Sequence, residues 1–311
     1  MQPVKIDFIG IGAQKAGTTW LFYQLKQLPD FSFPVLKELH YFSRSPEYAS
    51  SNFLAEPLLA NRLMDEEWAR LALEKVRSKK DEPRKAQWYA KWFFSDYTDE
   101  WYLSLFDASA PFKGEISPSY ALLKPKDIAE MHRLAPEAKI LFLLRNPVDR
   151  AWSQYRFYKG WHQKDFDFSQ VKAEDIIRFL DSDTQELRSD YLSTLRNYEQ
   201  VYPKDQILVG FYDAIAEQPV QLMEEVVGFI GGDTSQIEKY CQLEKKFTVS
   251  PAVPMPPEVR AYLKEKYRSQ IEQLAHRYGS YCQRWCEELY EEQSAGGEVP
   301  VQATVSGTVR I

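Results

Sequence analysis

A glycine-bounded loop close to the N-terminus constrains the fold of this chain more than any other feature. Residues 5–12 (KIDFIGIG) form a short apolar run that ends in glycine, as a buried parallel strand does. Residues 13–18 follow as a loop, and leucines at helical spacing then predict a helix to about Leu28. Such a loop brings free backbone N–H groups to the positive end of a helix dipole, so it predicts a binding site for a phosphate-like anion.

The spacing of this loop departs from the loop of nucleoside-triphosphate enzymes. Gly12, Gly17 and Thr19 stand where the pattern G-x-x-x-x-G-K-[ST] requires them, but Thr18 occupies the lysine position and Lys15 lies inside the loop. In those enzymes the lysine reaches the β- and γ-phosphates, and an acidic residue on a neighbouring strand helps to position magnesium. The plain alternative is a strand-to-helix turn that holds no ligand.

Strand and helix patterns alternate along the rest of the chain. The clearest further strands are residues 139–144 (KILFLL) and 206–211 (QILVGF), with helix patterns between them. This alternation predicts an α/β fold with a P-loop-like parallel sheet and helices on both faces, a three-layer α/β/α arrangement. The first of these strands ends at Arg145 rather than at an acid, and Asn146 and Pro147 predict the cap and first residue of the next helix. A relocated lysine with an arginine at the strand end suits an anion bound without a metal, so we expect no metal site.

The chain is expected to form one domain over residues 1–290, followed by a flexible tail over 291–311. A helical, aromatic-rich insertion interrupts the domain at about residues 44–98. Two interpretations of the insertion stay open: a helix and loop packed on the domain, or a lid whose aromatic residues face the substrate.

The net charge and the cysteine content limit which kind of partner and which cellular compartment are expected. The formal net charge of −6 argues against a nucleic-acid partner, because a polyanionic backbone selects basic surfaces. Three cysteines are too few for a disulfide scaffold and suggest reduced thiols. We find no signal peptide pattern and no run of about 20 apolar residues, so we expect no membrane span and a cytoplasmic location.

Four motifs in order give the chain a family resemblance. Residues 15–20 (KAGTTW) resemble the 5′-phosphosulfate loop of PAPS-dependent sulfotransferases, and residues 145–153 (RNPVDRAWS) resemble their 3′-phosphate motif. Residues 37–42 (KELHYF) and 114–120 (GEISPSY) also match. The resemblance extends over about residues 4–288 and is nearer to the heparan-sulfate-type and bacterial branch than to the steroid and phenol branch.

The resemblance implies that PAPS is the sulfuryl donor and PAP the product. The amides and hydroxyls of the loop would hold the 5′-phosphosulfate, Trp20 would lie near the adenine, and Arg145 with Ser153 would bind the 3′-phosphate. The residues implied in donor binding are Lys15, Ala16, Gly17, Thr18, Thr19, Trp20, Arg145 and Ser153.

Sulfuryl transfer is similar to phosphoryl transfer, an in-line displacement that depends on positioning and on charge stabilisation. By this analogy Lys15 would neutralise charge on the departing PAP. Glu38 matches the catalytic glutamate of the heparan-sulfate branch and is the favoured general base, with His40 as the alternative. If this segment is extended, residues two apart point to the same face, so both side chains would line the site.

Two departures from the family pattern concern the acceptor. Ile116 stands where the heparan-sulfate branch carries a lysine that faces the sugar chain, and residues 247–257 contain no lysine or arginine. A sulfated polysaccharide therefore fits less well than a hydroxyl or amine on a small-molecule, carbohydrate or carrier-bound acceptor. Two other classes stay open: a P-loop-type nucleotide kinase that needs magnesium, and a non-catalytic PAP- or nucleotide-binding module.

Overall fold

A central sheet organises the computed structural model, which describes residues 4–163, 166–245, 247, 253–291 and 308–310. The strands are β1 (Phe8–Gly12), β2 (Phe31–Ser32), β3 (Phe112–Ile116), β4 (Lys139–Leu144), β5 (Ile207–Phe211) and β6 (Thr308–Arg310). Their order is β2-β3-β1-β4-β5-β6, and every pairing is parallel except that of β6 with β5. The predicted α/β class is therefore confirmed.

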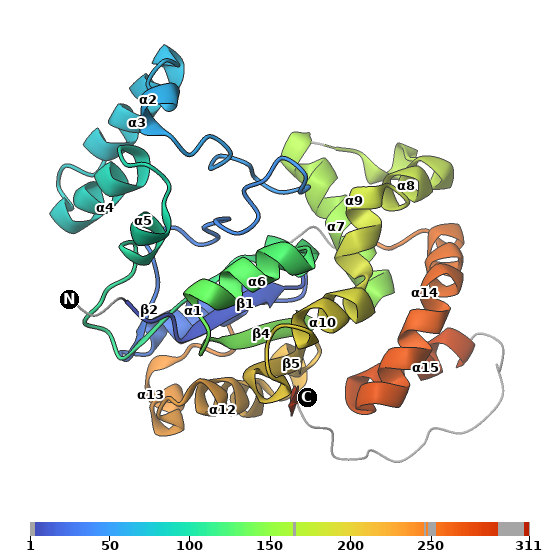
Figure 1. The fold of residues 1–311 in the computed structure, drawn as a ribbon. Helices are drawn as coiled ribbons and strands as arrows, with labels where there is room; N and C mark the ends of the chain where they lie inside the picture. The colour runs from blue at the N-terminus through green and yellow to red at the C-terminus, as the bar shows by residue number, and fades with distance from the viewer. Residues whose placement is uncertain (1–3, 164–165, 246, 248–252, 292–307, 311) are drawn as a thin grey trace.

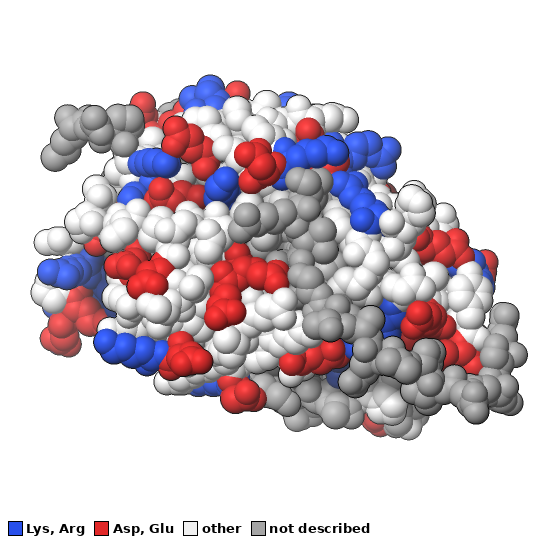
Figure 2. Space-filling model, turned by 90° about the horizontal axis from the view of Figure 1, so that it is seen from below, with Lys and Arg blue, Asp and Glu red and all other residues white. Residues whose placement is uncertain are grey.

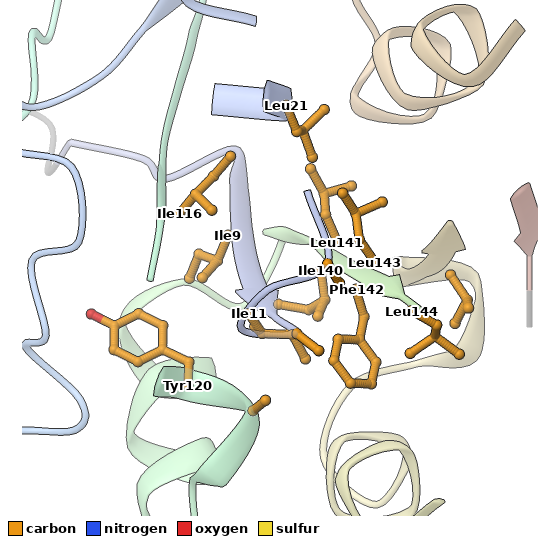
Figure 3. Packing of buried hydrophobic residues seen from close by; sticks show 14 of the residues in the cluster. Ile9, Ile11, Leu21, Ile116, Tyr120, Ile140, Leu141, Phe142, Leu143 and Leu144 are labelled. Atoms are coloured by element: carbon orange, nitrogen blue, oxygen red, sulfur yellow. The ribbon is translucent and has the colours of Figure 1, made fainter. Parts of the chain in front are cut away.

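The middle strands are buried because helices cover both faces of the sheet. All five residues of β1 are buried, and β4 pairs with it in the register Ile9↔Ile140. Side chains alternate between the faces along a strand. Figure 3 shows Leu141 beside Leu21 on one face, whereas Phe142 points to the face that Tyr120 covers. This double burial explains why the β4 sequence is continuously apolar.

Helices connect the strands and form the outer layers (Figure 1). The α-helices are α1 (Thr18–Gln27), α2 (Leu59–Arg62), α3 (Glu66–Arg77), α4 (Pro83–Phe93), α5 (Asp99–Leu103), α6 (Pro125–Leu134), α7 (Pro147–His162), α8 (Ala173–Leu180), α9 (Asp183–Glu186), α10 (Tyr191–Glu199), α11 (Ala214–Glu217), α12 (Pro219–Ile230), α13 (Ile237–Tyr240), α14 (Pro257–Tyr278) and α15 (Ser280–Tyr290). The 3₁₀ helices are η1 (Pro118–Leu122), η2 (Phe168–Gln170), η3 (Leu187–Ser189), η4 (Lys204–Gln206) and η5 (Thr234–Gln236). In Figure 1, α6 and α10 lie on one face of the sheet and α12 and α13 on the other.

The insertion extends away from the sheet as helices α2 to α4 (Figure 1). Two of its tryptophans pack against other side chains of the chain. Trp88 stacks on Trp92 at 5.3 Å between ring centres, and its indole N–H donates to the carbonyl of Leu105 at 2.9 Å. Trp92 in turn packs against Trp101 of α5. These contacts are of the kind that the packed interpretation expects, and the role of the insertion as a whole stays a prediction.

Three residues of the segment expected to be a flexible tail, residues 291–311, form a short strand, β6. Strand β6 pairs antiparallel with β5, with Val309 opposite Val209. Without β6 the parallel sheet would end at β5, whose free edge offers unpaired N–H and C=O groups to a further strand. Two of the three β6 residues are β-branched, which favours a strand. Residues 292–307 and 311 of the expected tail lie outside the described residues.

Charges of both signs are distributed over the surface. The chain has 45 Asp and Glu against 39 Lys and Arg. Figure 2 shows one face, on which the described acidic and basic side chains alternate in small groups. A nucleic-acid partner selects a continuous basic face, and the described residues in that view do not form one.

Candidate active site

The loop between β1 and α1 is shaped for an anion. Gly17 caps α1 with φ of 87°, and a Cβ atom there would lie 2.2 Å from Cδ1 of Ile215, so this position favours glycine. The cap has no side-chain hydrogen bond and the first turn of α1 contains no acidic residue, which leaves the positive helix end available. The amide of Ala13 donates to the carbonyl of Leu143 at 2.7 Å and ties the loop to β4.

Lys15 and Arg145 lie together at the carboxyl ends of β1 and β4. The Nη1 atom of Arg145 donates to the carbonyl of Lys15 at 3.1 Å. The ammonium of Lys15 lies 4.0 Å from the ring centre of Phe157 on α7. Burial, and then the charges of Arg145 and Arg156, lower the pKa of Lys15 to about 8. A lysine so placed gains stability when an anion binds beside it.

Helix α7 begins as predicted and carries two buried polar residues of the site. Asn146 caps the helix, and its side chain accepts from the amide of Val148 at 3.0 Å. Arg150 and Ser153 lie three residues apart on this helix, so they share a face, and both are buried. Thr18 of the loop is also buried.

Arg150 is a functional candidate to which the sequence motif had given no role. Its Nε atom donates to Oγ of Ser189 at 2.8 Å, but its Nη1 and Nη2 atoms have no hydrogen-bond partner among the described residues. The side chain is completely buried. An unpaired buried charge costs several kcal/mol, on the order of 3–5, so an anion bound beside this guanidinium would be strongly favourable. The signal available in sequence was its spacing of three residues before Ser153.

Arg188 is a second candidate, and no motif pointed to it. It lies in η3, which the Arg150–Ser189 contact holds against α7. Burial and then the charge of Arg150 lower the pKa of Arg188 to about 10, while the charge of Glu38 opposes this shift. Its guanidinium donates to the carbonyl of Ala49 in the insertion. Arg188 therefore bonds to the insertion and lies close enough to Arg150 of α7 and to Glu38 for their charges to affect it.

Glu38 and His40 come together, although not by the expected geometry. The segment is not extended, because Glu38 has φ of 65° and His40 has φ of 57°. The two side chains nevertheless face each other, with 3.7 Å between Oε2 of Glu38 and Nε2 of His40. The other carboxylate oxygen of Glu38 accepts from Lys37 at 2.5 Å.

A buried carboxylate holds this segment in place. Oε2 of Glu115 accepts from the backbone amide of Leu39 at 3.3 Å, and its carboxylate also accepts from Ser117, Tyr102 and Tyr120. The hydroxyl of Tyr120 accepts in turn from the backbone amide of Tyr41 at 3.0 Å. Burial raises the pKa of Glu115, and these hydrogen bonds oppose that shift. The two motifs at residues 37–42 and 114–120 thus meet in space.

Hydroxyl groups and an aromatic ring surround His40. Its Nδ1 atom lies 2.9 Å from Oγ of Ser119 and 3.1 Å from Oγ of Ser50. The ring of Phe53 packs edge-on at 5.8 Å between centres. Burial lowers the pKa of His40 while the charge of Glu38 opposes this shift, so the imidazole is neutral at pH 7.

Trp20 lies in the first turn of α1 and contacts a segment far away in the sequence. The indole N–H donates to the carbonyl of Leu243 at 3.1 Å, and the ring is buried. The next turn of α1 is tied to the same segment, because Gln24 donates to the carbonyl of Gln242. The adenine contact expected for Trp20 stays a prediction.

The described residues contain no group of three or more His, Cys, Asp or Glu side chains placed to hold a metal ion. Within the same part of the chain, no helix combines the length and apolar character needed to cross a bilayer.

A parallel α/β sheet with a glycine loop and buried cations at its carboxyl edge defines an anion-binding protein of the P-loop-like class. The chain matches the sulfotransferase domain family over residues 5–273. It belongs to this family, whose enzymes take a sulfuryl group from PAPS and release PAP.

Individual relatives show how far the similarity extends. A sulfotransferase structure from Alicyclobacillus acidocaldarius aligns over 88% of this chain and 95% of its own, with a TM-score of 0.58 and 24% identity. The sulfotransferase STF9 from Mycobacterium avium aligns over 86% and 77%, with a TM-score of 0.48 and 15% identity. The membrane-associated sulfotransferase kil1 of Dictyostelium discoideum is 29% identical over 155 residues, half of this chain. That match spans only 23% of the relative's length.

Proposed function

We propose that this chain transfers a sulfuryl group from PAPS to a hydroxyl or amine of a small-molecule, carbohydrate or carrier-bound acceptor and releases PAP. The observation that carries the proposal is a chain of neighbouring cations that starts at the loop before α1. Arg145 and Arg150 act on Lys15, and Arg188 lies beside Arg150, two donor atoms of which are unpartnered among the described residues. Such a set of buried cations is costly without a multiply charged anion.

The residues fit a donor that carries two separate anionic groups. We assign the amides and hydroxyls of Gly17, Thr18 and Thr19 to the 5′-phosphosulfate, since they begin a helix with a free positive end. We assign Arg145 and Ser153 to the 3′-phosphate. When bound, PAPS supplies an activated sulfuryl group and a stable leaving group.

In this proposal Lys15 stabilises negative charge that develops on the leaving side, because its ammonium lies in the loop beside Arg145. Glu38 removes the proton of the acceptor. Neutral His40 is a poorer base here, since its Nδ1 already contacts two serine hydroxyls and its Nε2 faces Glu38. We therefore infer that His40 orients the Glu38 carboxylate.

Two other functions fit the residues less well. A nucleotide kinase would use a lysine at position 18, where this chain has Thr18, and an acid at the end of β4, where it has Arg145. A module that only binds nucleotide would not need Lys15 and Glu38 in one site, yet the charge of Glu38 reaches Lys15. The cytoplasmic location also remains a prediction, which fractionation of cells expressing the chain would test.

Calorimetry with PAP, with and without EDTA, tests the donor assignment. We expect PAP to bind equally well in both conditions and to lose measurable binding in Arg145→Ala. Arg178→Ala is the matched control, because Arg178 has a side chain 79% exposed and pairs along its own helix with Asp175. Binding of ATP–Mg²⁺ in place of PAP, or a strict metal requirement, would reject the proposal.

A further inference from the structure

Three large aromatic side chains are exposed close to the candidate catalytic residues. Phe53 is 62% exposed, Phe157 is 37% exposed and Trp161 is 77% exposed. Most aromatic residues of this chain are buried, so aromatic exposure of this extent at one site suggests a ligand contact.

Two of these rings touch residues that would carry the chemistry, and the third packs on one of those two rings. Phe53 packs edge-on against His40, with 5.8 Å between the ring centres. The ring centre of Phe157 lies 4.0 Å from the ammonium of Lys15. Trp161 stands one turn further along α7, with its ring centre 5.9 Å from that of Phe157. Exposed apolar rings therefore lie beside His40, next to the proposed base, and beside Lys15.

Hydrogen bonds join the two elements that carry these rings. Arg188 donates to the carbonyl of Ala49, four residues before Phe53. The neighbouring residue Ser189 accepts from Arg150 of α7. The loop with Phe53 and the helix with Phe157 are thus both attached to η3, and the rings border one site.

We propose that Phe53, Phe157 and Trp161 form the acceptor subsite, and that the acceptor is a hydroxyl compound with an apolar body. This inference rests on the proposed function. The acceptor oxygen forms a bond to sulfur while the bond from sulfur to the phosphate oxygen of PAP breaks, and Glu38 takes the hydroxyl proton. Aromatic rings bind aromatic or aliphatic bodies through apolar burial, whereas an acidic sugar chain selects cations.

The charges around these rings bear on the choice of acceptor. Lys15 lies against Phe157, and Lys37 pairs with Glu38 at 2.5 Å, so both cations already have a contact within the chain. Arg150 and Arg188 are held by Ser189 and Ala49, and Ile116 of β3 is buried against Gly10 of β1 and adds no charge.

The test compares acceptors with labelled PAPS: 2-naphthol for an aromatic body, 1-decanol for an aliphatic body, and a desulfated heparan oligosaccharide. We expect sulfated naphthol or decanol, and the better of the two identifies the kind of body. Phe53→Ala and Trp161→Ala should each raise the KM for that acceptor at least tenfold and leave the Kd for PAP within twofold. Tyr240→Ala is the control, because Tyr240 is also an exposed aromatic residue, 36% exposed on α13, and takes no part in these contacts.

Two outcomes would overturn the inference. One is sulfation of the oligosaccharide while neither apolar alcohol is sulfated; the other is an unchanged KM in both aromatic variants. Calorimetry with PAP separates this failure from failure of the proposed function. A chain that binds PAP but sulfates neither naphthol nor decanol refutes the acceptor assignment, whereas a chain that does not bind PAP refutes the function itself.

Discussion

The carboxylate of Glu38 and the imidazole of His40 face each other, with 3.7 Å between Oε2 and Nε2. Because burial favours the neutral imidazole, we assign the proton transfer to Glu38 and an orienting role to His40. Glu38→Gln should reduce the single-turnover rate about 10²- to 10⁴-fold, the usual value of a general base. His40→Ala should reduce it only about tenfold, since a lost orienting contact is worth about 1 kcal/mol.

Rapid-quench measurement of labelled product at saturating PAPS tests both variants. Glu47→Gln provides a matched control, because Glu47 is an exposed partner of Lys124 at the surface. If His40→Ala abolishes transfer and Glu38→Gln does not, the assignment of the base is wrong.

Arg150 should strengthen donor binding without stabilising the unliganded protein. Its two unpartnered Nη atoms make the empty site costly, so Arg150→Met should leave the free energy of unfolding of the unliganded protein unchanged or raise it. The same variant should bind PAP at least about 30-fold more weakly, since losing one partner of a buried charge pair costs about 2 kcal/mol or more. Urea denaturation with and without PAP measures both quantities. Unchanged PAP stabilisation in the variant would remove Arg150 from the donor site.

The pKa of Lys15 gives donor binding a defined pH dependence. In the free protein this pKa is about 8, and a bound anion raises it. The contribution of Lys15 is therefore complete below pH 8 and is lost as the pH rises through the pKa of the complex. We expect PAP affinity to fall between pH 8 and higher values, and Lys15→Met to bind more weakly with this pH dependence removed. Calorimetry in buffers of different ionisation enthalpy should also detect proton uptake above pH 8; its absence would contradict the assignment.

Some of these features could be read from the sequence because local chemistry determines them. Strand β4 has the predicted bounds, since an uninterrupted apolar run meets an Asn-Pro pair that starts a helix. The loop around Gly17 could also be predicted, because the spacing of Gly12 and Gly17 between a strand and a helix is typical of an anion-binding loop and of few other structures. In both cases the determining residues are neighbours in the chain.

Other features depend on contacts between distant residues, which a single sequence does not reveal. The left-handed backbone at Glu38 and His40 is held by hydrogen bonds to Glu115 and Tyr120, more than 70 residues away. Arg188 reaches the site only because η3 packs on α7. Its local sequence carries no signal of that packing.

A network of buried hydrogen bonds places the Glu38 segment. Glu115 accepts hydrogen bonds from Leu39, Tyr102, Ser117 and Tyr120, and a glutamine can accept with only one oxygen. Glu115→Gln should therefore lower the free energy of unfolding by about 2–3 kcal/mol, the cost of leaving buried donors unpaired.

Because the network supports the base segment and the glycine loop is held separately by β4, kcat should fall at least tenfold in Glu115→Gln while the Kd for PAP stays within twofold. Glu130→Gln, at an exposed position on α6, should change neither value. If Glu115→Gln also lost affinity for PAP, the prediction would be wrong. The variant would then disturb the donor loop as well as the Glu38 segment.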